Sequence, residues 1–270
     1  GLYAISGNHL QGQTPDADLF DWFRRREPAY HLGGSIQVYE VQVQARGEWA
    51  AQCLDPGPLL APEEAEQLLG SDDLRHLTFD CRQSLVLAGD GAPGWLILPQ
   101  AEQWWFGEAV PLLASQLELV YRHDAAAGLP SFDVYYWPGA DSAQLAEGWQ
   151  RSGEQEGQAV SLPQALNDVA QLAGYRVDGQ QWSTLWLITA AAEEPLSLQA
   201  HLYKEAGSAP TVGDSLGFSS EQWQAGDWLL QRFSFGEAEE GLYLETGLYN
   251  FQTLETIGET INLAAEERRR

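Results

Sequence analysis

The last third of the chain alternates between hydrophobic and polar positions in a way that predicts β-strands. In the run 196–203, leucine and alanine alternate with polar residues, so that one face of the strand is apolar. Four such runs follow one another between turns, at 182–189, 196–203, 228–235 and 242–250. Together they predict a C-terminal antiparallel β-sandwich with a jelly-roll-like arrangement of strands.

Helix and strand patterns alternate along the first part of the chain. A helix is predicted at 62–70, which begins with proline and two acidic residues and ends at glycine. Short strand-like runs lie on both sides of it, at 2–6, 35–43, 74–79, 84–87 and 95–98. This mixture predicts an N-terminal α/β portion, so the expected fold class is mixed, with α/β structure followed by a β-sandwich.

A change of composition at 139–157 predicts a linker, because glycine, serine, glutamine and glutamate are concentrated there. The length of 270 residues leaves room for two domains. The expected organisation is an α/β domain at 1–138, a linker at 139–157, a β-sandwich domain at 158–263 and a charged tail at 264–270.

The chain is strongly acidic, with a formal net charge of −25 and a pI near 4.3. Such a charge argues against binding to nucleic acid or to an anionic membrane surface, since both would repel it. No apolar run approaches the roughly 20 residues that cross a bilayer, and residues 1–20 lack the pattern of a signal peptide. We therefore expect no direct membrane insertion by this chain. The absence of methionine suggests a fragment or a processed product.

Two cysteines, Cys53 and Cys81, allow two interpretations. A disulfide between them would close a loop of about 28 residues and stabilise the fold by roughly 3–4 kcal/mol in an oxidising compartment. Two free buried thiols fit the sequence nearly as well. No zinc-ligand spacing is present, so no metal site is predicted.

Two short motifs resemble ligand sites but have simpler explanations. The segment 89–94 matches G-x-G-x-x-G, yet a strand follows it instead of the helix that would hold a pyrophosphate, so a hairpin turn is predicted. Asp16 and Asp18 form a D-x-D pair of the kind that holds a divalent metal, but Asp18 stands where a helix N-cap is expected, and capping is favoured. No cofactor is expected.

No catalytic constellation is evident from the spacing of residues. The five histidines are scattered, and neither His-x-x-x-His nor Gly-x-Ser-x-Gly occurs. A hydrolase with carboxylates brought together from distant positions is the lowest-ranked hypothesis.

Aromatic residues are abundant, with 11 tryptophans and 10 tyrosines. Tryptophan rings stack well on sugar rings, and four tryptophans near predicted loops are candidate carbohydrate-binding residues: Trp104, Trp105, Trp223 and Trp228. The alternative, which is favoured, is that these aromatic side chains close the ends of the sandwich core.

Three stretches of the chain carry a family resemblance through the order of their motifs. The first contains Tyr3-Ala-Ile-Ser6, Leu10-Gln-Gly12, Phe20-Asp-Trp-Phe-Arg24, Arg26-Glu-Pro28, Gly34-Ser-Ile36 and Val38-Tyr39. The second runs from Leu77-Thr-Phe-Asp80 to Leu85-Val-Leu87. The third contains Leu172-Ala-Gly-Tyr175, Leu185-Trp186, Ala200-His-Leu202, Trp223-Gln-Ala-Gly-Asp227, Gly241-Leu-Tyr243 and Gly247-Leu-Tyr249. They cover about two thirds of the sequence and resemble the soluble, extracytoplasmic C-terminal region of bacterial membrane glycosyltransferases related to the dolichyl-phosphate-mannose protein mannosyltransferases, glycosyltransferase family 39.

The resemblance implies a function without implying a catalytic site in this chain. In that family the catalytic acids and the lipid-linked sugar site belong to the membrane part, so no catalytic residue is carried over. The chain is then a non-catalytic extracytoplasmic domain, periplasmic or on the cell surface, that serves in glycan or acceptor recognition or in assembly. Its implied partners are a membrane-embedded glycosyltransferase portion and a glycan or protein acceptor. The alternative is a stand-alone surface module that binds carbohydrate or protein.

Overall fold

The computed structural model is built mainly of β-strands arranged in four sheets. It describes residues 2–11, 20–24, 26–40, 47–55, 57–71, 73–100, 104–125, 129–178, 180–205, 207–235 and 243–264. The prediction of an N-terminal α/β portion is wrong, because strands dominate the described chain on both sides of residue 138 and its α-helices are only four to eight residues long. Asp16 and Asp18 lie outside the described residues. None of the described helices has the length and apolar character needed to cross a membrane.

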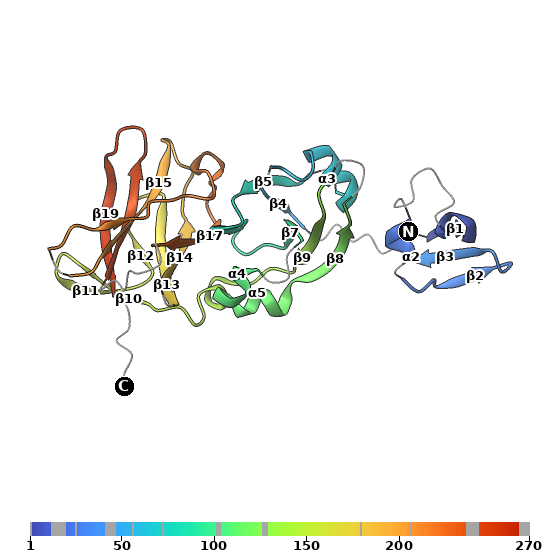
Figure 1. The fold of residues 1–270 in the computed structure, drawn as a ribbon, viewed down its shortest axis with the longest axis horizontal. Helices are drawn as coiled ribbons and strands as arrows, with labels where there is room; N and C mark the ends of the chain where they lie inside the picture. Colours follow the sequence, from blue (N-terminus) through green and yellow to red (C-terminus); the bar gives the residue numbers. More distant parts are fainter. Residues whose placement is uncertain are drawn as a thin grey trace.

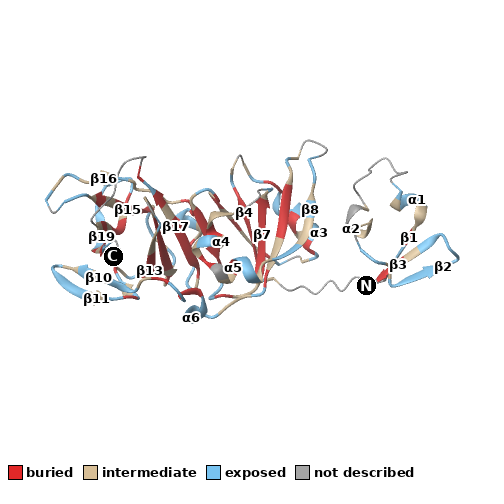
Figure 2. Ribbon diagram, turned by 60° about the horizontal axis from the view of Figure 1, so that its bottom comes forward, coloured by how far each residue is buried: buried red, intermediate tan, exposed pale blue. Residues whose placement is uncertain are grey.

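The N-terminal part is a three-stranded antiparallel sheet in the order β1-β3-β2, drawn in blue in Figure 1. Its elements are β1 (Leu2–Ser6), α1 (Gly7–Leu10), α2 (Asp21–Arg24), β2 (Tyr30–Leu32) and β3 (Ile36–Glu40). The ring of Phe23 in α2 packs against Tyr3 and Tyr39, with ring centroids 5.6 and 5.1 Å away. Figure 2 shows that this part is the most exposed of the molecule.

The middle part contains a five-stranded sheet in the order β5-β4-β7-β9-β8. Its strands are β4 (Trp49–Cys53), β5 (Arg75–Phe79), β7 (Gly94–Pro99), β8 (Glu118–His123) and β9 (Phe132–Trp137). β4 is parallel to β5 and β7, and α3 (Pro62–Leu69) makes the crossover from β4 to β5. Pro62 in the first turn and Gly70 at φ +67° begin and end α3 as predicted. The short helices α4 (Trp105–Ala109) and α5 (Pro111–Gln116) follow β7.

The C-terminal part consists of two antiparallel sheets that share one buried apolar cluster. The six-stranded sheet contains β11 (Gln158–Ser161), β10 (Ser152–Gln155), β19 (Thr256–Ala264), β18 (Tyr243–Asn250), β15 (Leu196–Tyr203) and β16 (Thr211–Val212), in that order. The other sheet contains β12 (Gln164–Ala165), β13 (Ala170–Asp178), β14 (Gln181–Ile188), β17 (Trp228–Ser234) and β6 (Ser84–Leu87). The four predicted strands of this region agree with β14, β15, β17 and β18 to within one residue wherever the chain is described.

The order of strands is that of an immunoglobulin-type sandwich. Pairing of β14 with β17 and of β15 with β18 reproduces the B–E and C–F pairs of that fold, with β13 and β19 in the places of strands A and G. The jelly-roll-like arrangement expected from the sequence is therefore wrong. The place of strand D, beside strand E, is taken by β6.

β6 links the middle part to the sandwich, because it lies between β5 and β7 in sequence but belongs to the sheet of β17. The pairing runs from Trp228 opposite Leu87 to Gln231 opposite Ser84. All four residues of β6 are buried, and one apolar cluster extends from the middle sheet into both sheets of the sandwich. Each fully buried leucine in such a cluster contributes about 1.5–3 kcal/mol. The middle and C-terminal parts are thus packed as one body.

Two further predicted features lie at this junction. Residues 89–94 form a turn, with a hydrogen bond from the Ala92 amide to the Gly89 carbonyl, 3.0 Å, and Asp90 at φ +54°. It is not a hairpin turn, because β6 and β7 on its two sides belong to different sheets. The predicted linker, 139–157, contains α6 (Ser142–Leu145) and β10.

Candidate functional site

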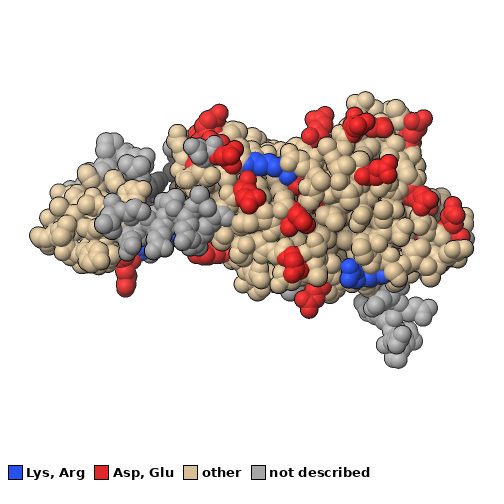
Figure 3. All heavy atoms as spheres, turned by 180° about the vertical axis from the view of Figure 1, so that it is seen from behind, with Lys and Arg blue, Asp and Glu red and all other residues tan. Residues whose placement is uncertain are grey.

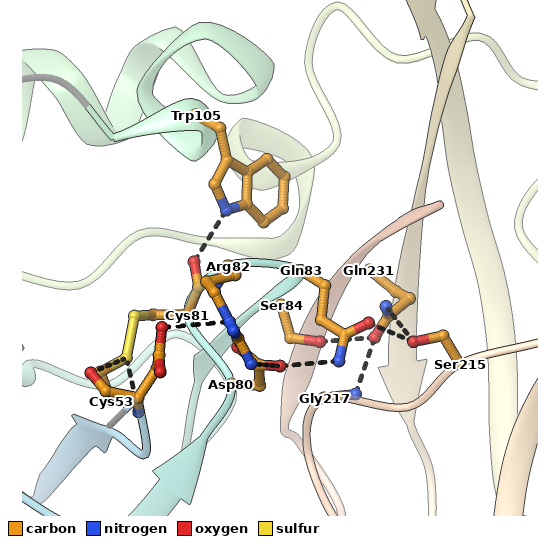
Figure 4. Close-up of polar contacts among 11 residues, drawn as sticks. Cys53, Asp80, Cys81, Arg82, Gln83, Ser84, Trp105, Ser215, Gly217 and Gln231 are labelled. Atoms are coloured by element: carbon orange, nitrogen blue, oxygen red, sulfur yellow. Dashed lines mark hydrogen bonds and ion pairs between the residues drawn. A yellow bond between two sulfur atoms is a disulfide. The ribbon is translucent and has the colours of Figure 1, made fainter. Parts of the chain in front are cut away.

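The disulfide is the first component of the junction. Cys53 at the end of β4 and Cys81 in the loop between β5 and β6 are joined, and both are buried. Of the two interpretations that the sequence left open, the structure therefore shows the bridge. The bond fixes the segment that leads into β6 to the middle sheet (Figure 4).

A buried ion pair is the second component. The two terminal guanidinium nitrogens of Arg75 on β5 contact the carboxylate of Asp227, with Nη1–Oδ1 at 2.5 Å and Nη2–Oδ2 at 2.7 Å. Asp227 is fully buried and also accepts hydrogen bonds from the amides of Gln224 at 2.9 Å and Gly89 at 3.4 Å. Such bidentate, charge-assisted contacts satisfy the buried carboxylate and set the position of the loop before β17.

A network of polar side chains surrounds the start of β6 (Figure 4). Ser84 Oγ and the Gly217 amide both donate to Gln231 Oε1, at 2.5 and 3.1 Å. Gln83 Nε2 donates to Asp80 Oδ2 at 2.9 Å. These residues come from β6 and the loop before it, from β17, and from the loop before β17, so the network holds these segments together.

Asp80 is the residue of this network whose acidity is most clearly altered. Burial by itself raises the pKa of Asp80, but hydrogen bonds from the side chain and amide of Arg82 outweigh that effect and hold the pKa below its ordinary value. The Asp80 amide donates to the Gly217 carbonyl at 2.6 Å. Asp80 is therefore a fixed, ionised carboxylate at neutral pH.

A groove of about 400 Å³ lies beside this network, between the middle part and the sandwich. We call it the junction groove; its lining residues are Leu54, Thr78, Asp80, Gln83, Leu196, Ser197, Leu216, Gly217, Ser219, Ser220, Gln222 and Phe251. Leu54, after β4, and Phe251, in the turn after β18, are 41% and 51% exposed. The groove thus combines two exposed apolar side chains with fixed polar groups.

Gln222 forms part of the wall of the junction groove by bonding to the edge of the middle sheet. Its side-chain oxygen accepts from the Thr78 amide at 2.9 Å, and its Nε2 donates to the Thr78 carbonyl at 3.1 Å. The amide group thereby takes the place of a neighbouring strand along β5, which is an edge strand. The two hydrogen bonds fix the Gln222 side chain against β5.

This arrangement is suited to recognition of an amphipathic ligand. Concave sites with apolar contacts and a few fixed polar groups bind small molecules and sugars, whose C–H faces lie on aromatic rings while their hydroxyls form hydrogen bonds. Among the described residues there is no group of three histidine, cysteine or acidic side chains placed to hold a metal ion.

The four candidate tryptophans are not brought together. Trp223 and Trp228 are 2% and 4% exposed, and the Trp223 indole donates to the Phe218 carbonyl at 3.1 Å, so their ring faces are withdrawn from ligands. Trp105 is partly buried on α4, donates to the Cys81 carbonyl at 2.9 Å and has Arg232 Cζ 5.4 Å from its ring centroid. Trp104 stacks on Phe106 with ring centroids 5.6 Å apart.

Sequence reasoning missed the junction groove because its lining comes from segments up to about two hundred residues apart. One signal was present: Phe251 follows the alternating run of β18 directly and stands in a turn, where a large apolar side chain has no core to enter. Comparisons of the chain with family models, with curated proteins and with solved structures found no match.

Proposed function

We propose that this chain is a non-catalytic extracytoplasmic domain of a membrane glycosyltransferase system, and that it recognises a glycan or a glycan-bearing acceptor in the junction groove. The observation that carries the proposal is the groove itself, in which exposed Leu54 and Phe251 lie beside fixed polar groups such as Asp80 and Gln222. This combination matches a sugar, which presents an apolar face and polar edges.

The disulfide supports the extracytoplasmic location. Cys53–Cys81 closes a 28-residue separation in the sequence, and disulfides of this kind persist in oxidising compartments and are rare in the cytosol. The acidic surface in Figure 3, where Asp and Glu side chains far outnumber Lys and Arg, suits a domain that stays dissolved beside a membrane without adhering to anionic lipid.

The sequence resemblance supports the glycosyltransferase system. The motifs from Tyr3 to Tyr39 and from Trp223 to Asp227 resemble the extracytoplasmic region of such enzymes. In this proposal the partners are the membrane-embedded glycosyltransferase portion, which supplies catalysis, and the glycan or protein acceptor, which this chain holds.

An array of bacterial glycans probed with the purified chain tests the proposal. We expect binding to one glycan class, weakened at least tenfold by Phe251→Ala. Leu254→Ala is the matched control, because Leu254 lies in the same turn and is 76% exposed but does not line the groove. Sugar transfer by the isolated chain from a nucleotide or polyprenyl donor would contradict the proposal, and so would the absence of glycan binding.

A further inference from the structure

A second group of side chains with ligand-binding chemistry lies on the outer face of the six-stranded sheet, away from the sandwich core. We call it the tyrosine–carboxylate cluster and define it by Tyr203, His201, Asp214, Tyr243 and Glu245. The register of β15 and β18 places Tyr203 opposite Tyr243 and His201 opposite Glu245. Asp214, which follows β16, reaches the cluster at His201, with Oδ1 3.5 Å from Nε2.

The two tyrosines form a stacked aromatic pair, with their rings face to face. Their ring centroids are 4.8 Å apart and the rings are 12° from parallel. Burial, the nearby charge of Glu245 and the Tyr243 ring raise the pKa of Tyr203, so its hydroxyl stays protonated near neutral pH. Both residues are half-buried.

The two carboxylates are fixed through one oxygen each. Gln199 Nε2 donates to Glu245 Oε1 at 2.7 Å, and the Ala200 amide donates to Asp214 Oδ1 at 2.7 Å. The second oxygens, Glu245 Oε2 and Asp214 Oδ2, accept no hydrogen bond from any described residue. The Glu245 and Asp214 side chains are 27% and 21% exposed, so both carboxylates lie partly at the surface.

A third acceptor lies next to them. Asn262 on β19 stands directly opposite Glu245 in the register, and its Oδ1 is buried without a hydrogen-bond partner within the described chain. The carboxylate oxygens beside the tyrosine pair that lack a hydrogen bond within the described chain are acceptors. They match a group that only donates, and a primary ammonium, with three N–H donors and no acceptor, is such a group.

Electrostatics favours the same group. Tyrosine rings attract cations to their faces, both carboxylates are negative, and the whole chain carries a net charge of −25, which raises the local concentration of cations. A neutral sugar hydroxyl gains none of these charge interactions.

We infer that the tyrosine–carboxylate cluster binds the primary ammonium group of an amino sugar. The inference rests on the proposed glycan-recognition function, which favours an amino sugar over a lysine side chain as the source of the ammonium. An outer ring face of the stacked tyrosine pair provides an apolar surface for the sugar ring, while Glu245 and Asp214 provide the acceptors for its ammonium. The cluster is thus a second contact surface for a glycan, separate from the residues that line the junction groove.

Calorimetric titration with two matched oligosaccharides tests the inference. A β-1,4-linked glucosamine hexamer carries ammonium groups, and its fully N-acetylated counterpart does not. We expect the amine form to bind at least tenfold more tightly, and this preference to be lost in Glu245→Gln and Tyr243→Leu, whose thermal unfolding midpoints confirm that they are folded.

The control is Glu193→Gln, which removes the same charge from an exposed position before the opposite end of β15. If Glu193→Gln and Glu245→Gln weaken binding of the glucosamine hexamer equally, the hexamer is attracted by the net charge of the chain alone, and the inference is overturned. Equal binding of both hexamers would overturn it too, and so would tighter binding of a trilysine peptide. If the array detects a glycan whose binding depends on Phe251 while the glucosamine hexamer does not bind, the inference fails and the proposed function stands.

Discussion

Arg75 and Asp227 are 152 residues apart in the sequence and form a bidentate ion pair across the junction of the middle part and the sandwich. Asp227 is fully buried, whereas the Arg75 side chain is 21% exposed. Removing one partner of such a pair leaves an uncompensated buried charge. The pair therefore makes the position of the loop before β17 depend on β5.

Arg75→Ala is expected to lower the free energy of unfolding by about 3 kcal/mol, because the Asp227 carboxylate stays buried without its cation. Urea unfolding followed by tryptophan fluorescence measures the change. Arg82→Ala is the control: Arg82 also pairs with carboxylates, those of Asp55 and Asp80, but its side chain is 68% exposed, so a smaller loss of at most about 1 kcal/mol is expected. Equal effects of the two substitutions would contradict the assigned role of Arg75.

Leu85→Ala in β6 is expected to destabilise the chain by about 2–5 kcal/mol, since Leu85 is 1% exposed in the shared cluster. Hydrogen exchange locates the effect: amides of β17, its partner, should lose protection although β17 lies far away in the sequence. The corresponding substitution Leu119→Ala, at a 44% exposed position of the edge strand β8, should leave β17 unchanged. Loss of protection confined to the middle sheet would show that β6 does not complete the sandwich.

Replacing both cysteines, Cys53→Ser with Cys81→Ser, is expected to cost roughly 3–4 kcal/mol of unfolding free energy, because the unfolded chain regains the freedom of a 28-residue loop. Urea titrations of the double variant and of the native chain with and without reductant measure this cost. The native chain with reductant should match the double variant, and reductant should leave the double variant unaffected. A native chain that is insensitive to reductant would argue against the bridge.

The lowered pKa of Asp80 predicts that the stability of the chain depends on pH. The pKa of Asp80 is lowered in the folded state. The ionised carboxylate therefore adds to the free energy of unfolding in full above the unfolded-state pKa of about 3.9. This stabilisation is lost as the pH falls through the lower pKa of the folded state. Asp80→Asn should therefore reduce stability at pH 6 and flatten its decrease below about pH 4. Urea midpoints measured between pH 2.5 and 6 give both slopes. Parallel curves for the two proteins would show that Asp80 has no part in acid unfolding.

The alternation of apolar and polar residues was sufficient to predict four strands of the sandwich. Alternation in β15 and β18 predicted both strands and their apolar core faces, although Ser197 and Gln199 on the other face of β15 are buried too. The helix at α3 was equally clear from Pro62 and Gly70. These features depend on neighbours in sequence, which is why the sequence alone indicates them.

Features that depend on distant segments could not be predicted in this way. Ser84–Leu87 reads as a short buried strand, but four apolar-rich residues do not indicate which sheet they join, so the place of β6 beside β17 was missed. Asp227 stood in a recognised motif, yet nothing nearby in sequence points to Arg75. The prediction of an N-terminal α/β portion is wrong because a short helical pattern in sequence does not show whether the helix covers a sheet. In the structure these short helices connect strands.

The central claim is that a glycan binds in the junction groove, and amide chemical-shift mapping tests it most directly. The chain is titrated with the highest-scoring glycan from the array, and shifts are followed for all assigned amides. The account predicts the largest shifts at Leu54, Gly217 and Phe251, and their disappearance in Phe251→Ala but not in Leu254→Ala. Largest shifts in the N-terminal sheet, at β1, β2 and β3, or shifts that survive Phe251→Ala, would contradict it.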